Sequence, residues 1–396
     1  MEQKNLPVVH VINGRQKKLM QGHPWVYGNE IERVEGEPDD GALVTVVDFR
    51  GRYMGTGFFN SRSLITVRLL THRQEEITDG LIAERVRAAC AYRRFVLQRE
   101  DTDSCRLIYG EADRLPGVIA DRFGSVIVLQ VLALGMERYT QVIADTLVEC
   151  AKPACLLLQN DDAIRRKEGM ECFTRVLCGA LPEETIIHEN GIRLSVDVMG
   201  GQKTGYFLDQ KDNHLFLRQF CRDARVLDCF SYIGGFALNA AAAGAKEVTA
   251  VDISEDAVER IRRNAQLNDL DVNAVCANCF DYLRAQVKVK ERYDVIVLDP
   301  PAFTKAHANM ANACRGYKEI ALSAMRLLPP GGVLATHSCS YHMPEEVFVN
   351  TVLSAAQDLH RQVRVITLRR QDIDHPVLAG YPESHYLKSL WLQMLD

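Results

Sequence analysis

The stretch 226–236 constrains the fold of this chain more than any other. It reads as a short buried strand ending at Asp228, a turn containing Gly234, and the start of a helix. A second apolar run ends in Asp252, 24 positions after Asp228. This order of elements is typical of the nucleotide-binding half of a doubly wound sheet: a strand, a glycine turn, a helix and a second strand that ends in a carboxylate. The ligand in such a sheet lies at the C-terminal ends of the strands, and Asp252 is placed to bind its ribose hydroxyls.

The glycine pattern of this turn narrows the kind of nucleotide. A dinucleotide site needs G-x-G-x-x-G, so that backbone amides can approach a pyrophosphate. Here Asp228 begins the turn, and the position of the third glycine of that pattern is not occupied by glycine. A carboxylate at that place repels phosphate but suits a cationic ligand such as S-adenosylmethionine, which has an amino group and a sulfonium. The alternative is an α/β core whose glycines only make a tight turn.

The stretch resembles motif I of the class I methyltransferases. The resemblance implies that Asp228, Phe230 and Gly234 contact S-adenosylmethionine and that Asp252 binds its ribose. From residue 225 onward strands and helices alternate, which predicts a parallel sheet with helices on both faces. Asp281 follows the third strand, where it is expected to accept a hydrogen bond from the adenine amino group. A compatible alternative is that Asp281 caps the following helix.

Bulk properties bound the class of protein. At 396 residues the chain has room for two or three domains, and its net charge of −5 gives no whole-chain argument for nucleic acid. Twelve cysteines lack a framework spacing, so most are expected to be reduced and buried. The pair Cys276 and Cys279 has no partner pair at zinc-site spacing, and no metal is predicted. With no signal layout and no apolar run of membrane-spanning length, we expect a cytoplasmic protein without a membrane partner.

Residues 1–75 are rich in short apolar or alternating runs and predict a small β-barrel. Within residues 1–75, most acidic residues lie in the segment 30–40, and outside that segment Lys and Arg outnumber Asp and Glu. Arg15, Lys17 and Lys18 are therefore predicted to belong to a phosphate-contacting face. The alternative is an ordinary solvated rim.

The segment Gly22-His23-Pro24-Trp25-Val26-Tyr27, with the basic run before it, resembles the PUA domain at the front of certain ribosomal RNA methyltransferases. That resemblance implies an RNA-binding domain over 1–75. Trp25 and Tyr27 are nevertheless expected in the core, because alternating aromatics of a short strand usually face inward.

Residues 76–185 predict an α+β unit. Its first element is an amphipathic helix over 81–97, with four arginines assigned to its polar side, namely Arg85, Arg87, Arg93 and Arg94. No acid, base or nucleophile in this unit stands at motif spacing. The run from Gly110 to Gly117 resembles the linker domain of the same methyltransferases, which implies a role in positioning RNA and bracing the catalytic domain. The alternative is pure scaffolding.

Residues 186–396 are predicted to form the catalytic domain, beginning with a hairpin over 186–198 whose turn is Glu189-Asn190-Gly191. The run 202–213 then matches the segment that precedes motif I in this family. The match implies that three residues contact the cofactor, namely Tyr206, Phe207 and Gln210. The alternative is a plain helix start with Asp209 as its cap.

Asp299-Pro300-Pro301 ends the fourth strand of the alternating pattern, next to the expected methyl donor. The prolines remove amide donors and stiffen the loop, so that a flat base can lie against it. In amino-group methyltransferases an aromatic residue follows the proline pair. Here Ala302 stands at that place and Phe303 comes one position later, which weakens the amino-methylation interpretation. Phe303 is predicted to contact RNA.

Cys339 follows the fifth strand and precedes a helix that opens near Pro344, so the helix dipole favours its thiolate. A thiolate that adds to C6 of cytosine makes C5 nucleophilic enough to take a methyl group, while a carboxyl group such as Asp299 stabilises the charge shift. These two residues are therefore the predicted catalytic pair. The alternative for Cys339 is a buried and inert cysteine.

The whole chain resembles the ribosomal RNA large subunit methyltransferase I family. The resemblance implies a class I methyltransferase sheet behind a PUA barrel and a linker domain, with S-adenosylmethionine as donor. It also implies C5 methylation of a cytosine in 23S rRNA, in naked RNA or a precursor of the large subunit, with a homodimer as an option. Two alternatives stay open, an N2-guanine methyltransferase and a non-catalytic RNA-binding assembly factor. Ala302 departs from the second cysteine that many RNA cytosine-5 methyltransferases carry there for product release.

Overall fold

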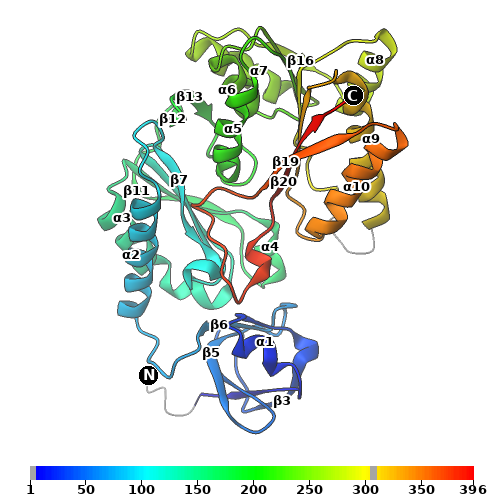
Figure 1. The fold of residues 1–396 in the computed structure, drawn as a ribbon. Helices are drawn as coiled ribbons and strands as arrows, with labels where there is room; N and C mark the ends of the chain where they lie inside the picture. The colour runs from blue at the N-terminus through cyan, green and yellow to red at the C-terminus, as the bar shows by residue number, and fades with distance from the viewer. Residues whose placement is uncertain (1–5, 304–309) are drawn as a thin grey trace. The chain divides into compact units, whose positions relative to one another are not determined.

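The computed structural model describes residues 6–303 and 310–396, which form two compact units. The chain crosses between the units several times (Figure 1). The first unit comprises the residues up to Thr185, Asp197–Tyr206 and Ile373–Ser384; the second comprises Ile186–Val196, Phe207–Asp372 and His385–Asp396. The sequence did not predict that the segment Ile373–Ser384, from the end of the catalytic region, belongs to the first unit.

The N-terminal part of the first unit is a six-stranded sheet in the order β2-β6-β5-β4-β1-β3. Its apolar side chains, such as Val9, Val46 and Leu69, make one buried core, as a small barrel requires. The elements are β1 (Val8–Val11), α1 (Gln16–Met20), β2 (Trp25–Val26), β3 (Ile31–Glu35), β4 (Leu43–Val47), β5 (Tyr53–Phe59) and β6 (Val67–Thr71). The sequence missed β3, because most of its side chains are exposed and it lies in the acidic segment.

The central part of the first unit is a five-stranded sheet in the order β11-β10-β9-β8-β7, packed against two helices. Strands β9 and β10 are buried along their whole length. The elements are α2 (Asp79–Val96), β7 (Ser104–Tyr109), β8 (Val118–Phe123), β9 (Val126–Val131), α3 (Thr140–Ala151), β10 (Cys155–Asn160), α4 (Ala163–Lys167) and β11 (Phe173–Gly179). The predicted α+β character of this region is therefore what the structure has.

The polar side assigned to α2 is wrong for two of its four arginines. Arg85 and Arg93 are each only 2% exposed. Arg85 donates to the carbonyl oxygens of Leu70 and Arg114, and Arg93 forms an ion pair with Asp113 at 2.6 Å. A helical period shows which face a residue lies on, but it does not reveal that carbonyls and a carboxylate are there to satisfy a buried guanidinium.

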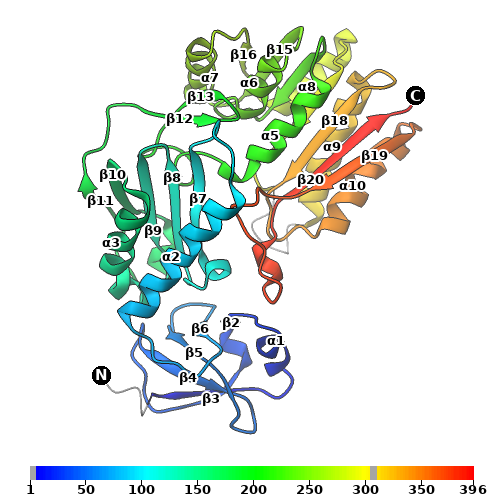
Figure 2. The ribbon, with the colours of Figure 1, turned by 60° about the vertical axis from the view of Figure 1, so that its left-hand side comes forward.

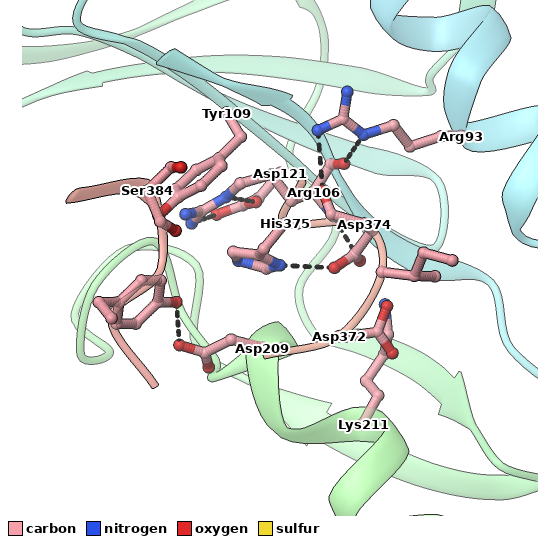
Figure 3. Close-up of polar contacts among 12 residues, drawn as sticks. Arg93, Arg106, Tyr109, Asp121, Asp209, Lys211, Asp372, Asp374, His375 and Ser384 are labelled. Carbon is pink, nitrogen blue, oxygen red and sulfur yellow. Dashed lines mark hydrogen bonds and ion pairs between the residues drawn. The ribbon is translucent and has the colours of Figure 1, made fainter. Parts of the chain in front are cut away.

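The segment Ile373–Ser384 is tied to β7 and α2 within the first unit. The carboxylate of Asp374 accepts from the backbone N–H of Arg106 at 3.0 Å, and its carbonyl accepts from Arg93 at 2.8 Å (Figure 3). Tyr109 donates its hydroxyl to the carbonyl oxygen of Ser384 at 3.1 Å. These bonds lie at both ends of the segment and fix it along the central sheet.

The second unit is built on a seven-stranded sheet in the order β16-β15-β14-β17-β18-β20-β19 (Figure 2). Residues of α5, α6 and α7 pack on one face, and those of α8, α9 and α10 on the other. The strands are β14 (Arg225–Cys229), β15 (Glu247–Asp252), β16 (Asn273–Cys276), β17 (Val295–Leu298), β18 (Val333–Ser338), β19 (Val363–Arg369) and β20 (Lys388–Met394). The helices are α5 (Lys211–Leu217), α6 (Gly235–Ala242), α7 (Glu255–Leu267), α8 (Cys279–Val289), α9 (Met310–Leu327) and α10 (Glu345–Asp358).

The predicted sheet with helices on both faces is confirmed, but the expectation of a wholly parallel sheet is wrong at one strand. β20 pairs antiparallel with both β18 and β19. The hairpin before the sheet, β12 (Thr185–Glu189) and β13 (Ile192–Val196), forms where it was predicted. Its turn residues Asn190 and Gly191 both have positive φ, as a two-residue hairpin turn demands.

Two helix caps differ from the sequence interpretation. Asn278 accepts from the backbone N–H groups of Phe280 and Asp281, so Asn278 caps α8 and Asp281 lies inside its first turn. Asp209 lies in a short 3-10 turn ahead of α5, and its side chain caps no helix start. Asn and Asp are near-equivalent as caps, so local sequence does not decide between neighbours.

Candidate active site

The loop between β14 and α6 is held in a compact, unusual backbone conformation. Phe230, Tyr232 and Gly234 all have positive φ, at 64°, 50° and 92°. Left-handed conformations are costly for residues with a Cβ, and they concentrate where the fold holds a loop around a ligand. Gly234 directly precedes α6, so the N–H groups at the start of that helix open onto the same loop.

Asp228 is fully buried at the base of this loop. Its Oδ2 accepts from the backbone N–H of Ala237 at 3.1 Å, whereas Oδ1 has no hydrogen-bond partner among the described residues. Burial, reinforced by the nearby charges of Asp299 and Asp252, raises the pKa of Asp228 to about 8. A buried carboxylate with an unsatisfied oxygen fits a cationic ligand group, which would restore its charged form.

Asp252 ends β15 beside the same loop, as predicted. Its two oxygens accept from the backbone N–H groups of Tyr232 and Ser254, each at 2.9 Å. The ring of Phe207 meets the ring of Tyr232 edge to face at 5.3 Å. Phe207, Tyr232 and Asp252 are thus brought together on the second unit. Tyr206, predicted with them, is buried and belongs to the first unit.

Asp281 lies on the outer side of α8, where it pairs with Arg284 at 2.9 Å and its side chain is 73% exposed. Its neighbour Phe280 points inward instead and meets Phe230 edge to face at 6.3 Å. The carboxylate predicted for the adenine amino group therefore lies in solvent, beside an aromatic ring that faces the motif I loop.

Asp299 is oriented by a chain of side chains. Arg369 donates to Asn213 at 3.0 Å, Asn213 donates to Gln210 at 2.7 Å, and Gln210 donates to Asp299 at 3.0 Å. The side-chain amides of Asn213 and Gln210 are each fixed in orientation, because each accepts a hydrogen bond from one neighbour and donates one to the next. The sequence predicted Gln210 and Asp299 separately, and the structure brings them into contact.

Cys339 and Asp299 stand at the ends of adjacent strands. β17 and β18 pair in parallel with Leu298 opposite Thr336, so both residues follow the same edge of the sheet. Cys339 is half-buried and lies outside the apolar cores. The pKa of Tyr317, which is raised mainly by burial, is raised further by the charges of both Cys339 and Asp299. The hydroxyl of Tyr317 itself lies 2.9 Å from the hydroxyl of Ser338, the residue before Cys339.

Phe303 is half-buried against aromatic neighbours. Its ring lies 4.7 Å from the ring of Tyr317 and 5.8 Å from that of Phe280. This packing holds Phe303, two positions after the Asp-Pro-Pro run, against α9 and α8. The ring that is predicted to contact RNA is therefore partly exposed.

The basic residues predicted to contact RNA lie around α1. Arg15 and Lys17 are exposed, whereas Lys18 pairs with Glu30 at 2.6 Å and lies 4.5 Å from the ring centroid of Tyr27. The indole of Trp25 donates to Glu111 at 2.7 Å and packs against the ring of Tyr381.

Sequence reasoning missed several polar residues near the proposed catalytic pair. The sequence does not predict that Arg369 and Asn213 orient Asp299, nor that Tyr386 donates a hydrogen bond to Asp209. Lys388 is 3% exposed at the start of β20. A lysine at the start of a strand with four large apolar residues is a signal that the sequence did contain.

Two further observations concern the described residues as a whole. Within 6–303 and 310–396, no cluster of three or more His, Cys, Asp or Glu side chains is arranged to hold a metal ion. Over the same residues, every helix is too short or too polar to cross a bilayer.

Comparison with known families agrees with this fold and site. Residues 9–72 match the model of PUA-like domains, and residues 125–371 match the model of S-adenosylmethionine-dependent methyltransferases. A putative S-adenosylmethionine-dependent methyltransferase from Streptococcus mutans superposes with a TM-score of 0.84, at 20% identity over 98% of this chain and 99% of that chain. A putative methyltransferase complexed with SAH gives the same values. The chain is an S-adenosylmethionine-dependent methyltransferase with a PUA-like domain, and the unpartnered oxygen of Asp228 fits that cationic cofactor.

Curated relatives define the family more narrowly. A ribosomal RNA large subunit methyltransferase I from Salmonella arizonae is 40% identical over 97% of this chain and 96% of its own length. One from Klebsiella pneumoniae is 41% identical over 96% of this chain and 97% of its own length. The chain belongs to the ribosomal RNA large subunit methyltransferase I family.

Proposed function

We propose that this protein methylates C5 of a cytosine in 23S rRNA, with S-adenosylmethionine as donor and Cys339 as nucleophile. The names of the relatives support large-subunit ribosomal RNA as the substrate. The observation that carries the cytosine chemistry is the placement of Cys339 and Asp299 at adjacent strand ends, where the charge of each acts on Tyr317. An amino-group methyltransferase has no need of a thiol at this position.

The proposed reaction begins when the thiolate of Cys339 adds to C6 of the cytosine. The electron pair of the C5–C6 double bond shifts toward N3, and the carboxyl group of Asp299 stabilises the charge that develops there. S-adenosylmethionine supplies the methyl group that C5 then takes. Water removes the proton from C5, the bond between sulfur and C6 breaks, and the thiolate of Cys339 is restored. Water is assigned this step because Ala302 stands where related enzymes carry a second cysteine.

Cofactor binding is assigned to residues at the ends of β14, β15 and β17. Asp228 would hold the cationic amino group of the donor, Gly234 would let the backbone approach it, and Asp252 would accept from the ribose hydroxyls. The full proposed set is Tyr206, Phe207, Gln210, Asp228, Phe230, Gly234, Asp252, Asp281 and Asp299. Asp281 has the weakest support, because its carboxylate lies in solvent and is paired with Arg284.

RNA binding is assigned to the PUA-like domain over 1–75, through Arg15, Lys17 and Lys18, and to Phe303 beside the catalytic pair. The linker region 76–185 would position the RNA, and residues 186–396 would carry out catalysis. We propose that the substrate is 23S rRNA or a precursor of the large subunit in the cytoplasm.

The sharpest test replaces Cys339. The Cys339→Ala protein should bind S-adenosylmethionine normally but transfer no label to 23S rRNA, whereas Cys172→Ala, a half-buried cysteine of the first unit, should act as wild type. RNA carrying 5-fluorocytosine should trap the wild-type protein, because fluorine cannot leave C5 as a proton does. A tryptic peptide containing Cys339 would then carry the nucleotide mass. Label transfer by Cys339→Ala would eliminate the covalent mechanism.

Two other outcomes are distinguished by the product. N2-methylguanosine in the nucleoside digest of treated rRNA would replace the cytosine reaction with amino-group methylation on the same fold. If no methylated nucleoside forms and calorimetry shows no S-adenosylmethionine binding, the chain would instead be an RNA-binding assembly factor.

A further inference from the structure

Lys388 is a buried lysine that the proposed reaction has not used. It opens β20 and is 3% exposed. A buried ammonium is unfavourable unless its N–H groups are hydrogen-bonded. Its Nζ donates to the carbonyl oxygen of Ser340 at 2.6 Å and to that of Tyr386 at 2.7 Å. The ammonium is therefore held against the turn that follows β18.

That turn carries Cys339. Ser338, the last residue of β18, lies opposite Lys388 in the antiparallel pair of β18 and β20, and Cys339 comes between Ser338 and the bonded Ser340. Burial lowers the pKa of Lys388 to about 8, and the charge of Cys339 opposes that change. Because such an interaction is mutual, the ammonium stabilises a thiolate at Cys339 to the same degree.

We propose that Lys388 is a positioning residue for Cys339: it fixes the turn through the Ser340 carbonyl, and its positive charge favours the thiolate. The inference rests on the proposed function, because Cys339 acts as a nucleophile only in the proposed cytosine methylation. When the thiolate forms, the S–H bond of Cys339 breaks, the electron pair stays on sulfur and the proton passes to water. No further reactant is needed.

Other charged groups surround the same turn. The charge of Glu345, on α10, raises the pKa of Lys388. Asp299, at the end of β17, acts on Tyr317 of α9 together with Cys339. Burial lowers the pKa of His385, and the charges of Arg370 and Lys388 lower it further.

Asp299 and Glu345 thus act on the same two side chains as Cys339, and the ammonium of Lys388 carries the charge opposite to theirs. Removing only the lysine charge should therefore shift the balance toward the neutral thiol.

The test measures how fast the Cys339 thiolate reacts with iodoacetamide. The full-length protein without RNA is alkylated between pH 6 and 9, and the peptides containing Cys339 and Cys276 are quantified by mass spectrometry. Cys276 is exposed and serves as the internal control. In Lys388→Met, alkylation of Cys339 at pH 7 should be about tenfold slower and its midpoint should move to higher pH, while Cys276 should be unaffected.

A second variant separates charge from positioning. Lys388→Gln keeps a donor for the Ser340 carbonyl but removes the charge, so it should slow alkylation of Cys339 as Lys388→Met does. In methylation assays, both variants should lower kcat and shift its pH profile upward, with the KM for S-adenosylmethionine unchanged. Alkylation of Cys339 at the wild-type rate in Lys388→Gln would overturn the electrostatic role.

The alkylation readout does not depend on catalysis. If Cys339→Ala retained methylation, the proposed function would fail, yet the effect of Lys388 on the thiol would still be measured. If Cys339→Ala were inactive and both lysine variants alkylated normally, only the present inference would fail.

Discussion

At the residue scale, the most informative group is the carboxyl group of Asp228, because its environment disfavours its own charge. A carboxyl buried with one oxygen unpartnered is stable only when protonated or when a cation neutralises it. Its folded pKa of about 8 lies above that of an unfolded aspartate, so the stability it contributes is present at low pH. That stability is lost as pH rises from about 4 to 8. Cofactor binding would then be linked to ionisation of this one group.

The substitution Asp228→Asn should therefore stabilise the protein without cofactor. The gain in the free energy of unfolding over wild type should grow by about 3–4 kcal/mol from pH 5 to pH 8, because asparagine has no charge to bury. Urea unfolding at both pH values measures this, and calorimetry should show S-adenosylmethionine binding weakened by about 100-fold or more. A stability difference that does not change with pH would mean that Asp228 is ionised in the free protein.

His337 gives the opposite pH dependence. It is fully buried on β18, neither ring nitrogen has a partner among the described residues, and it stacks on Phe236 with ring centroids 4.9 Å apart. Burial lowers the pKa of His337 to about 3, below that of an unfolded histidine. The stability it contributes is thus present above about pH 6.5 and is lost as pH falls toward 3.

Replacing His337 by Phe keeps the ring contact and removes the buried nitrogens. We expect His337→Phe to be more stable than wild type by about 1–2 kcal/mol at pH 5, with a smaller difference at pH 8. Chemical unfolding at the two pH values checks the prediction. Equal differences at both would show that a bound water or an unrecognised partner satisfies the imidazole.

At the scale of the element, the turn from β14 into α6 depends on one glycine. Gly234 has φ 92°, and a Cβ there would lie 3.3 Å from Cδ1 of Leu238. Gly234→Ala should lower the free energy of unfolding by about 1–2 kcal/mol, and because the loop must shift, it should weaken S-adenosylmethionine binding by about tenfold.

Gly244, at the other end of α6, is the matched control for that substitution. It has φ 85° but no atom within 4 Å of its would-be Cβ. Gly244→Ala should cost about 1 kcal/mol of stability from its backbone alone and leave cofactor affinity unchanged. Isothermal calorimetry measures the affinity of both variants for S-adenosylmethionine. Only a displaced loop should weaken that affinity, whereas backbone strain alone should not. Equal cofactor affinity in the two would contradict a role for Gly234 in shaping the site.

The elements that local sequence specifies were predicted, and those that depend on distant partners were not. The hairpin turn at Asn190 and Gly191 and the motif I turn follow from residues within a few positions of each other. The burial of Arg93 depends on Asp113 and on the carbonyl of Asp374, and the role of Lys388 depends on the turn after β18. No periodicity along one helix or strand encodes such partners.

At the scale of the whole molecule, the chain returns to its first unit near its C-terminal end. The segment Ile373–Ser384 connects β19 with β20 but packs within the first unit, against both the barrel and the central sheet. His23 lies 3.2 Å from Glu383, and the rings of Trp25 and Tyr381 have centroids 4.8 Å apart. This segment is therefore a structural part of the PUA-containing unit, although it lies in the sequence between two strands of the second unit.

Gly380 is the position at which that arrangement is most sensitive. A Cβ on Gly380 would lie 2.2 Å from the carbonyl oxygen of Gln21 and 2.9 Å from Cα of Gly22, both backbone atoms that cannot rotate away. Gly380→Ala must therefore push the segment off the barrel, at a cost of about 1–3 kcal/mol. Gly80→Ala is the control, because its Cβ would meet only Thr78 at 3.6 Å.

Hydrogen exchange followed by mass spectrometry locates the effect of Gly380→Ala. Peptides from the barrel strands β2 and β6 should exchange faster than in wild type, because they lose the packing of Tyr381 on Trp25. Peptides from β14 and β17 should be unchanged, since those strands belong to the second unit. Unaltered exchange in the barrel would mean that the returning segment only lies on it. Faster exchange in β14 and β17 as well would mean that the two units unfold together.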